Sequence, residues 1–113
     1  MTSPDALAAV RAEQERTTRQ IESLQRAVDS IVEAAELTST DDEHDPEGAT
    51  IAYERAQALA LLRQACEDLD VLSDARRQLE TGQAVVCVEC GQAIALERLI
   101  ALPTARRCIR CAA

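Results

Sequence analysis

Four of the five cysteines in this chain of 113 residues occur as two close pairs near its carboxyl end. The pairs are Cys87 with Cys90 and Cys108 with Cys111, so each pair has the spacing C-x2-C. This spacing lets both thiolates of a pair reach one tetrahedral ion, and Gly91, directly after Cys90, supplies the backbone freedom that such a knuckle needs. Because protein sulfur fills all four positions, we predict one structural Zn²⁺ and no open position for catalysis.

A redox-active C-x-x-C pair is the alternative interpretation, but no thioredoxin-like βαβ pattern surrounds these cysteines. Three arginines beside the second pair, Arg106, Arg107 and Arg110, are expected to offset the charge of a zinc tetrathiolate and to donate to its sulfurs. The fifth cysteine, Cys66, has apolar neighbours in a helical segment and is expected to fill a core position.

The composition indicates a mostly helical chain. There is no Trp or Phe and one Tyr, and the Ala, Leu, Arg, Glu and Gln that dominate favour helix over sheet. The net charge is −8, and no basic run is interleaved with aromatics, so we expect no direct sequence-specific binding of nucleic acid. The sequence shows no signal peptide and no run of about 18 apolar residues. We therefore expect a cytoplasmic protein without membrane contact.

Two long amphipathic helices are expected in residues 3–81. The first begins with Ser3-Pro4-Asp5, which offers a capping side chain, a proline whose missing N–H costs nothing there, and an acid near the positive helix end. The second begins with the same signal, Asp45-Pro46-Glu47, and ends at Thr81-Gly82, where glycine suits the left-handed cap position. The predicted fold class is mostly α: a long antiparallel helical hairpin, or coiled coil, followed by a four-cysteine zinc finger in residues 82–113.

An apolar seam with the 3,4 spacing of a coiled coil runs along each expected helix, and seven of its nine positions are apolar in both. The first seam is Leu7, Val10, Gln14, Thr17, Ile21, Leu24, Val28, Ile31 and Ala35, and the second is Ile51, Arg55, Ala58, Leu62, Ala65, Leu69, Leu72, Arg76 and Leu79. Leu59 and Cys66 are expected to widen the second seam. Tyr53 is expected to pack across the hairpin, with a contact to a partner as the alternative. Each helix would be roughly 50 Å long. A four-helix bundle formed by two hairpins is the alternative.

The connection between the helices, within residues 39–48, concentrates acidic side chains around the only histidine. Asp45 is explained as a helix cap. Asp41, Asp42 and Glu43 are not needed for capping, and their carboxylates repel one another. Their presence therefore favours a functional role over a purely structural one. We predict that Asp41, Asp42, Glu43 and Asp45 form an acidic tip that binds a partner, with a solvated loop as the alternative.

The cysteine region resembles the zinc finger of the DksA/TraR family of bacterial regulators that bind RNA polymerase. The resemblance includes positions other than cysteine, in order, and is therefore more specific than the cysteine spacing alone. These positions are Gly91, Ile94, Arg98, Leu99, Ala101, Pro103, Thr104 and Ala105. The long helical hairpin ahead of the finger is the family's other hallmark.

This resemblance implies a transcription regulator that is not an enzyme and whose hairpin enters the secondary channel of RNA polymerase to modulate initiation. It would act as a monomer on the polymerase, and a dimer is possible when it is free. The family's tip, Asp-x-x-Asp-x-Ala, is matched in part, because Asp42 and Asp45 have its spacing whereas Glu47 replaces its alanine. Leu102 and Ala112 stand where the family has basic residues for guanosine tetraphosphate, so no alarmone site is implied.

Two other functions stay open at this point. The chain could be an adaptor that dimerises through its hairpin and binds a partner other than polymerase through its finger. It could also be a Gre-like factor whose tip carboxylates hold a second Mg²⁺ for transcript cleavage, although only the acidity of the tip resembles such factors. No nucleophile with a placed base and no phosphate-binding glycine loop occurs, so we expect no catalysis by this chain alone.

Overall fold

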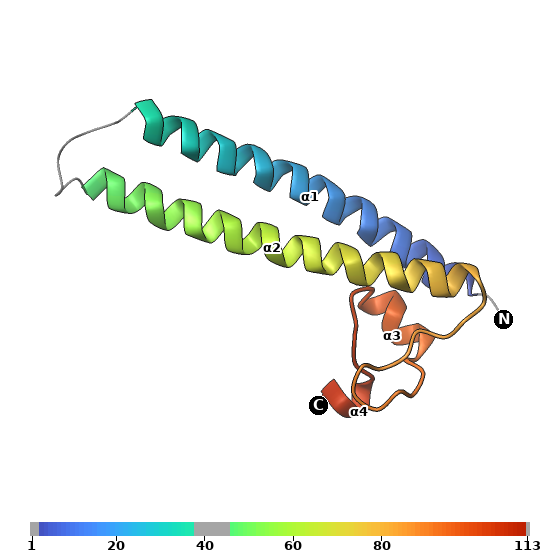
Figure 1. Cartoon of the computed structure of the whole chain (residues 1–113). Coiled ribbons are helices and arrows are strands. Elements are labelled where there is room, and N and C mark those ends of the chain that lie inside the picture. Colours follow the sequence, from blue (N-terminus) through green and yellow to red (C-terminus); the bar gives the residue numbers. More distant parts are fainter. Residues whose placement is uncertain (1–2, 38–45, 113) are drawn as a thin grey trace. The chain divides into compact units, whose positions relative to one another are not determined.

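The computed structural model describes residues 3–37 and 46–112, and these form two long helices and two short ones (Figure 1). The long helices are α1, Pro4–Leu37, and α2, Pro46–Glu80, and the short ones are α3, Leu96–Ala101, and α4, Ile109–Ala112. No strand occurs among the described residues, where one isolated antiparallel bridge joins Val86 to Ala93. The predicted fold class is confirmed. The acidic tip residues Asp41, Asp42, Glu43 and Asp45 lie outside the described residues.

The chain forms two compact units. The finger unit consists of Met1–Thr18 and Glu67–Ala113, and the middle unit consists of Arg19–Cys66. The predicted boundary between a hairpin domain and a finger domain, at residues 81 and 82, stays a prediction. None of the helices described is both long and apolar enough to cross a membrane.

Local side-chain and backbone chemistry sets the start of α1 and the end of α2 as predicted. The Ser3 hydroxyl accepts a hydrogen bond from the backbone N–H of Ala6 at 3.3 Å, which caps the start of α1. At the end of α2, Gly82 has φ 76°. The N–H of Gly82 donates to the carbonyl of Leu79 at 3.2 Å, and that of Gln83 donates to the carbonyl of Gln78 at 2.7 Å. This pair of bonds is a Schellman motif, which requires the left-handed backbone that glycine adopts without strain.

The finger unit contains the hydrophobic core. α1 contributes Ala6 and Val10, α2 contributes Leu72, Ala75 and Leu79, and the segment after α2 contributes Val85, Cys87, Ile94, Leu99, Ala105 and Cys108. Val10, Leu72 and Leu99 are fully buried. The cysteine region therefore shares one core with the first turns of α1 and the last turns of α2.

The middle unit packs along a narrow seam. Among its described residues only Ala58 and Ala65 are buried, while the seam residues Ile21, Leu24, Val28, Ile31, Ile51 and Leu62 are half-buried. Three expectations for this unit were wrong, because Leu59 and Cys66 are exposed and Tyr53 is 70% exposed. Leu59 and Cys66 each follow a buried alanine by one position, about 100° around the helix, and Tyr53 follows Ile51 by about 200°. One partner helix does not cover so wide a face.

Candidate metal centre

The first cysteine pair lies on a tight turn between two short extended segments. The N–H of Cys87 donates to the carbonyl of Gln92 at 2.8 Å, and that of Ile94 donates to the carbonyl of Val85 at 2.8 Å. The N–H of Gly91 closes the turn on the carbonyl of Cys87 at 3.0 Å. Gly91 has φ 73°, which explains why glycine follows the second cysteine of the pair.

The second pair lies at the start of α4. The N–H groups of Cys111 and Ala112 donate to the carbonyl of Cys108 at 3.1 and 3.0 Å. The helical turn thereby brings the side chains of Cys108 and Cys111 to the same side of the segment. Two such turns, one from each cysteine pair, give the four sulfurs fixed backbone supports.

Hydrogen bonds and an ion pair also connect the segments that carry the two cysteine pairs. The N–H of Val88 donates to the carbonyl of Arg106 at 2.9 Å, and the Nε of Arg98 in α3 donates to the carbonyl of Arg107 at 2.9 Å. An ion pair of 3.0 Å also joins the Nε of Arg107 to the Oε1 of Glu89. These contacts connect residues that are 9 to 18 positions apart in sequence, so the spacing of the cysteines alone does not reveal them.

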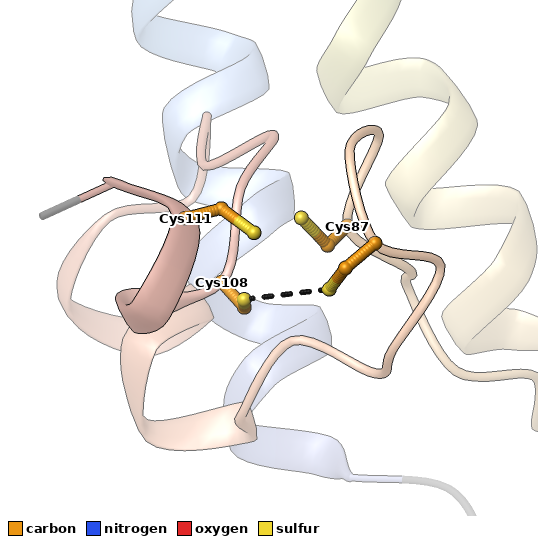
Figure 2. Close-up of side chains that lie close together, drawn as sticks. Cys87, Cys108 and Cys111 are labelled. Atoms are coloured by element: carbon orange, nitrogen blue, oxygen red, sulfur yellow. Dashed lines mark hydrogen bonds between the residues drawn. The ribbon is translucent and has the colours of Figure 1, made fainter.

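The four sulfurs converge on one point. Figure 2 shows Cys87, Cys108 and Cys111 turned toward one another, and the four Sγ atoms lie within 4.8 Å of one another. The Sγ atoms of Cys90 and Cys108 are 3.7 Å apart. Four sulfurs around Zn²⁺ with bonds of about 2.3 Å would be separated by about 3.8 Å in a regular tetrahedron. The described geometry therefore fits a zinc tetrathiolate, and the four cysteines are positioned to bind one metal ion.

The electrostatics of the cluster favour a cation at its centre. Backbone N–H groups, that of Cys90 first, lower the pKa of Cys87 to about 6. The N–H of Cys111 likewise lowers the pKa of Cys108, whereas the adjacent Cys108 side chain raises the pKa of Cys111. Sulfurs this close repel one another as thiolates, and a divalent ion bound to all four removes that penalty.

The four cysteines differ in their exposure to solvent. Cys87 and Cys108 are buried and belong to the hydrophobic core, and Cys111 is half-buried, while Cys90 is exposed. A four-sulfur site leaves no coordination position for water or substrate, so its chemistry is structural. Bound zinc would form four bonds to sulfur and so join the two cysteine pairs. It would also remove the repulsion between their thiolates.

The structure adds backbone donors around the cysteines and corrects one expectation, that for Cys66. Arg107 forms its ion pair with Glu89, and the hydrogen bonds that lower the pKa of Cys87 and Cys108 come first from backbone N–H groups. Backbone amides therefore donate to these two sulfurs, and the expected compensation of a bound zinc tetrathiolate by Arg106, Arg107 and Arg110 stays a prediction. Cys66, which we expected to be a core residue, is exposed on α2 and is not part of the sulfur cluster.

Comparison with known proteins agrees with this arrangement. A family described as the prokaryotic dksA/traR C4-type zinc finger matches residues 75–113. The solved structure of the transcription factor DksA2 from Pseudomonas aeruginosa is 30% identical in sequence and covers 93% of this chain. The match includes 81% of that protein's chain with a TM-score of 0.52. Among curated proteins no match is found.

A closed four-sulfur site that shares its core with two long helices defines the class of the protein as a helical C4 zinc-finger protein. The similarity to DksA2 extends beyond the finger to nearly the whole chain, including α1 and α2. The chain belongs to the DksA/TraR family. Members of this family are transcription regulators, and a role of that kind follows for this chain.

Proposed function

We propose that this protein binds RNA polymerase and modulates the initiation of transcription from within the secondary channel. The observation that carries the proposal is the 30% identity to the transcription factor DksA2 over 93% of this chain. Because that similarity covers the helices as well as the finger, it favours a shared mode of action. RNA polymerase as the partner would place this action in the cytoplasm.

In this proposal the acidic tip is the part of the protein that affects the catalytic centre of the polymerase. Asp41, Asp42, Glu43 and Asp45 carry four carboxylates within five positions of the sequence. A negative cluster of this kind would bias a polymerase centre that is built around Mg²⁺ and basic residues. The chain itself would be a regulator and not an enzyme, as its family membership implies.

The finger is proposed to present a fixed surface to the polymerase. Its four cysteines would hold Zn²⁺, and Val85, Ile94, Leu99 and Ala105 attach it to the helix ends in one core. A docking surface that is already ordered loses less entropy on binding than a flexible one. Zinc would therefore act on affinity for the polymerase indirectly, through the order of the finger.

Binding to purified core RNA polymerase tests the proposal. The zinc-loaded protein should bind the polymerase, and a transcript-cleavage factor that occupies the secondary channel should displace it. Retained binding at saturating competitor would refute the placement in the channel.

A photoreactive amino acid at position 43 should crosslink to polymerase peptides next to the catalytic centre. The same group in place of Asp70, which is exposed on α2 in the finger unit, is the matched control. It should give crosslinks to different peptides or none. Identical crosslinked peptides from the two positions would contradict a specific role of the tip.

An adaptor that dimerises is the second candidate, and exposed side chains on α2 favour it. Tyr53 is 70% exposed and Leu61 is 49% exposed in the middle unit, where large apolar side chains suit contact with another protein. A stable dimer that shows no affinity for purified polymerase would support the adaptor and overturn the main proposal.

A further inference from the structure

Polar residues that interrupt the two apolar seams meet in the finger unit. Gln14 interrupts the seam of α1 and Arg76 interrupts the seam of α2. The Nη1 of Arg76 donates a hydrogen bond to the Oε1 of Gln14 at 3.1 Å. The Nε2 of Gln14 in turn donates to the Oγ of Ser73 at 3.3 Å. All three side chains are half-buried, so these bonds are partly shielded from water.

The contact extends into a network that joins the helices more than once. The Nε of Arg76 donates to the Oε1 of Glu80 at 2.7 Å, and the Nη2 of Arg11 donates to the same oxygen at 3.2 Å. Residues of α1 and α2 are therefore joined at Arg11 with Glu80, at Gln14 with Arg76 and at Gln14 with Ser73. We name these five residues, Arg11, Gln14, Ser73, Arg76 and Glu80, the polar clasp.

The polar clasp can form in one register of the two helices. If α1 moved by one heptad in one direction, Gln14 would face Leu69 and Arg76 would face Leu7. In the other direction Gln14 would face Gln83, beyond the end of α2, and Arg76 would face Ile21. Either shift places the guanidinium of Arg76 against an aliphatic seam residue and removes its amide partner, which is unfavourable at a half-buried position.

The apolar seam residues cannot distinguish the native register from a register shifted by one heptad. Leu, Ile, Val and Ala recur at heptad spacing along both seams, so a shift by one heptad exchanges one aliphatic contact for another. Polar pairs at seam positions are the known means by which helical pairs specify one register, at some cost in stability. No buried side-chain N or O atom in the described part of the chain lacks a partner, so the native register satisfies these polar groups.

We propose that the polar clasp fixes the register of α1 against α2 in the finger unit. That register places Ala6 and Val10 in one core with Leu72, Ala75 and Leu79, and the finger packs on this core. A register error would therefore disrupt the surface that supports the metal centre. The inference concerns the fold of the finger unit and does not depend on polymerase binding.

Distance measurement between two spin labels tests the proposal in the full-length, zinc-loaded protein. The labels replace Glu15 and Asp74, which are exposed on α1 and α2, in a Cys66→Ser background that removes the exposed thiol. A shift by one heptad moves one label by roughly 10 Å along the helix axis. The distribution of label distances therefore reports the register directly.

The parent protein should give a single distance population. The double variant Gln14→Leu with Arg76→Leu should gain a second population that rises from undetected to roughly a tenth of the molecules or more. Arg55→Leu is the matched control, because Arg55 interrupts the second seam in the middle unit and forms no ion pair within the described residues. It should keep the single population.

A folded, zinc-loaded double variant with the parent's single distance population would overturn the proposal. The same second population in Arg55→Leu would overturn it too, because a general rise in apolarity would then be the cause. If the double variant does not fold, Gln14→Leu and Gln14→Glu decide the matter. Gln14→Glu keeps a partner for Arg76 and should preserve one register, whereas Gln14→Leu should not, and equal behaviour of the two would also refute the proposal.

Discussion

The finger unit and the middle unit use the same two helices in different ways. In the finger unit, residues of α1, α2 and the cysteine region surround a shared core in which Val10, Leu72 and Leu99 are fully buried. In the middle unit, the described buried residues are two alanines, Ala58 and Ala65. A coiled-coil seam alone buries little apolar surface per residue, whereas a third layer on the same helices completes a core.

This difference predicts unequal local stability within one chain. Regions with few buried apolar side chains open at lower free energy than regions with a dense core. The finger unit also has the polar clasp and the four-sulfur metal centre. The middle unit is therefore expected to be the more easily opened of the two as long as zinc is bound.

Metal removal should reverse this order and is expected to have the largest effect. Structural zinc contributes on the order of 10 kcal/mol to small zinc modules. A chelator should therefore abolish amide protection in residues 82–112, while residues 19–37 and 46–66 keep the exchange rates that they have with zinc. Hydrogen exchange read by mass spectrometry measures both regions in one experiment.

The control for metal removal is Cys66→Ser, which should retain one zinc per chain and the parent's protection. Cys108→Ser should reproduce the effect of the chelator. Equal loss of protection in both units after chelation would show that the two do not differ in their dependence on the metal.

Truncation of one core leucine in each unit should give the next largest difference. Leu72 is fully buried in the finger unit, so Leu72→Ala should lower the free energy of unfolding by about 2–5 kcal/mol. Leu62 is a half-buried seam residue of the middle unit, and Leu62→Ala should cost roughly 1–2 kcal/mol. Urea unfolding of the zinc-loaded variants measures both, and equal losses would contradict the difference in packing.

Replacement by alanine should change the stability of the protein in opposite directions at two glycines, one within α2 and one directly after it. Gly82 has φ 76°, a left-handed conformation in which a Cβ is unfavourable, so Gly82→Ala should destabilise the protein by about 1–2 kcal/mol. Gly48 lies within α2 in the middle unit, and Gly48→Ala should stabilise it by up to about 1 kcal/mol. Thermal unfolding of both variants provides the measurement. If both variants shifted the melting temperature in the same direction, the left-handed backbone at Gly82 would not be what makes glycine favourable there.

Features that depend on local chemistry were predictable from the sequence. The cap at Ser3, the glycine turn at Gly82 and the convergence of four cysteines each depend on a few neighbouring residues or on a known ligand spacing. The half-buried seam residues of both helices also followed from the spacing of apolar side chains. These parts of the fold need little knowledge of distant contacts.

The burial of residues beside the predicted seams was not predictable, because it depends on whether a further segment packs on the two helices. An exposed Tyr53 and a buried Ala75 both lie off the predicted seam. The finger packs beside Ala75, whereas Tyr53 lies in the unit that has no third layer. The hydrogen bond from the Nε of Arg98 to the carbonyl of Arg107 was not predictable either. It joins two segments, and the sequence pattern does not indicate that they lie close together.

The smallest expected effect concerns Glu80, which belongs to the polar clasp. The hydrogen bond from Arg76, and then that from Arg11, lowers the pKa of Glu80 below its ordinary value. A carboxyl whose pKa is lower in the folded protein stabilises it above the ordinary pKa, about 4.3 for glutamate. That stabilisation is lost as the pH falls through the lower pKa of the folded state. Glu80→Gln should therefore have a lower melting temperature than the parent at pH 7, and the two should converge once the pH has fallen below the lowered pKa of the folded state.

The matched control is Glu67→Gln, because Glu67 is exposed in the same unit and forms no ion pair within the described residues. Zinc loss at acid pH affects parent and variants alike, so the difference between them at each pH isolates the carboxylate. The effect should be small, since the side chain of Glu80 is 37% exposed and water screens its ion pairs. A difference between Glu80→Gln and the parent that does not vary with pH would mean that the clasp uses Glu80 for packing and not for its charge.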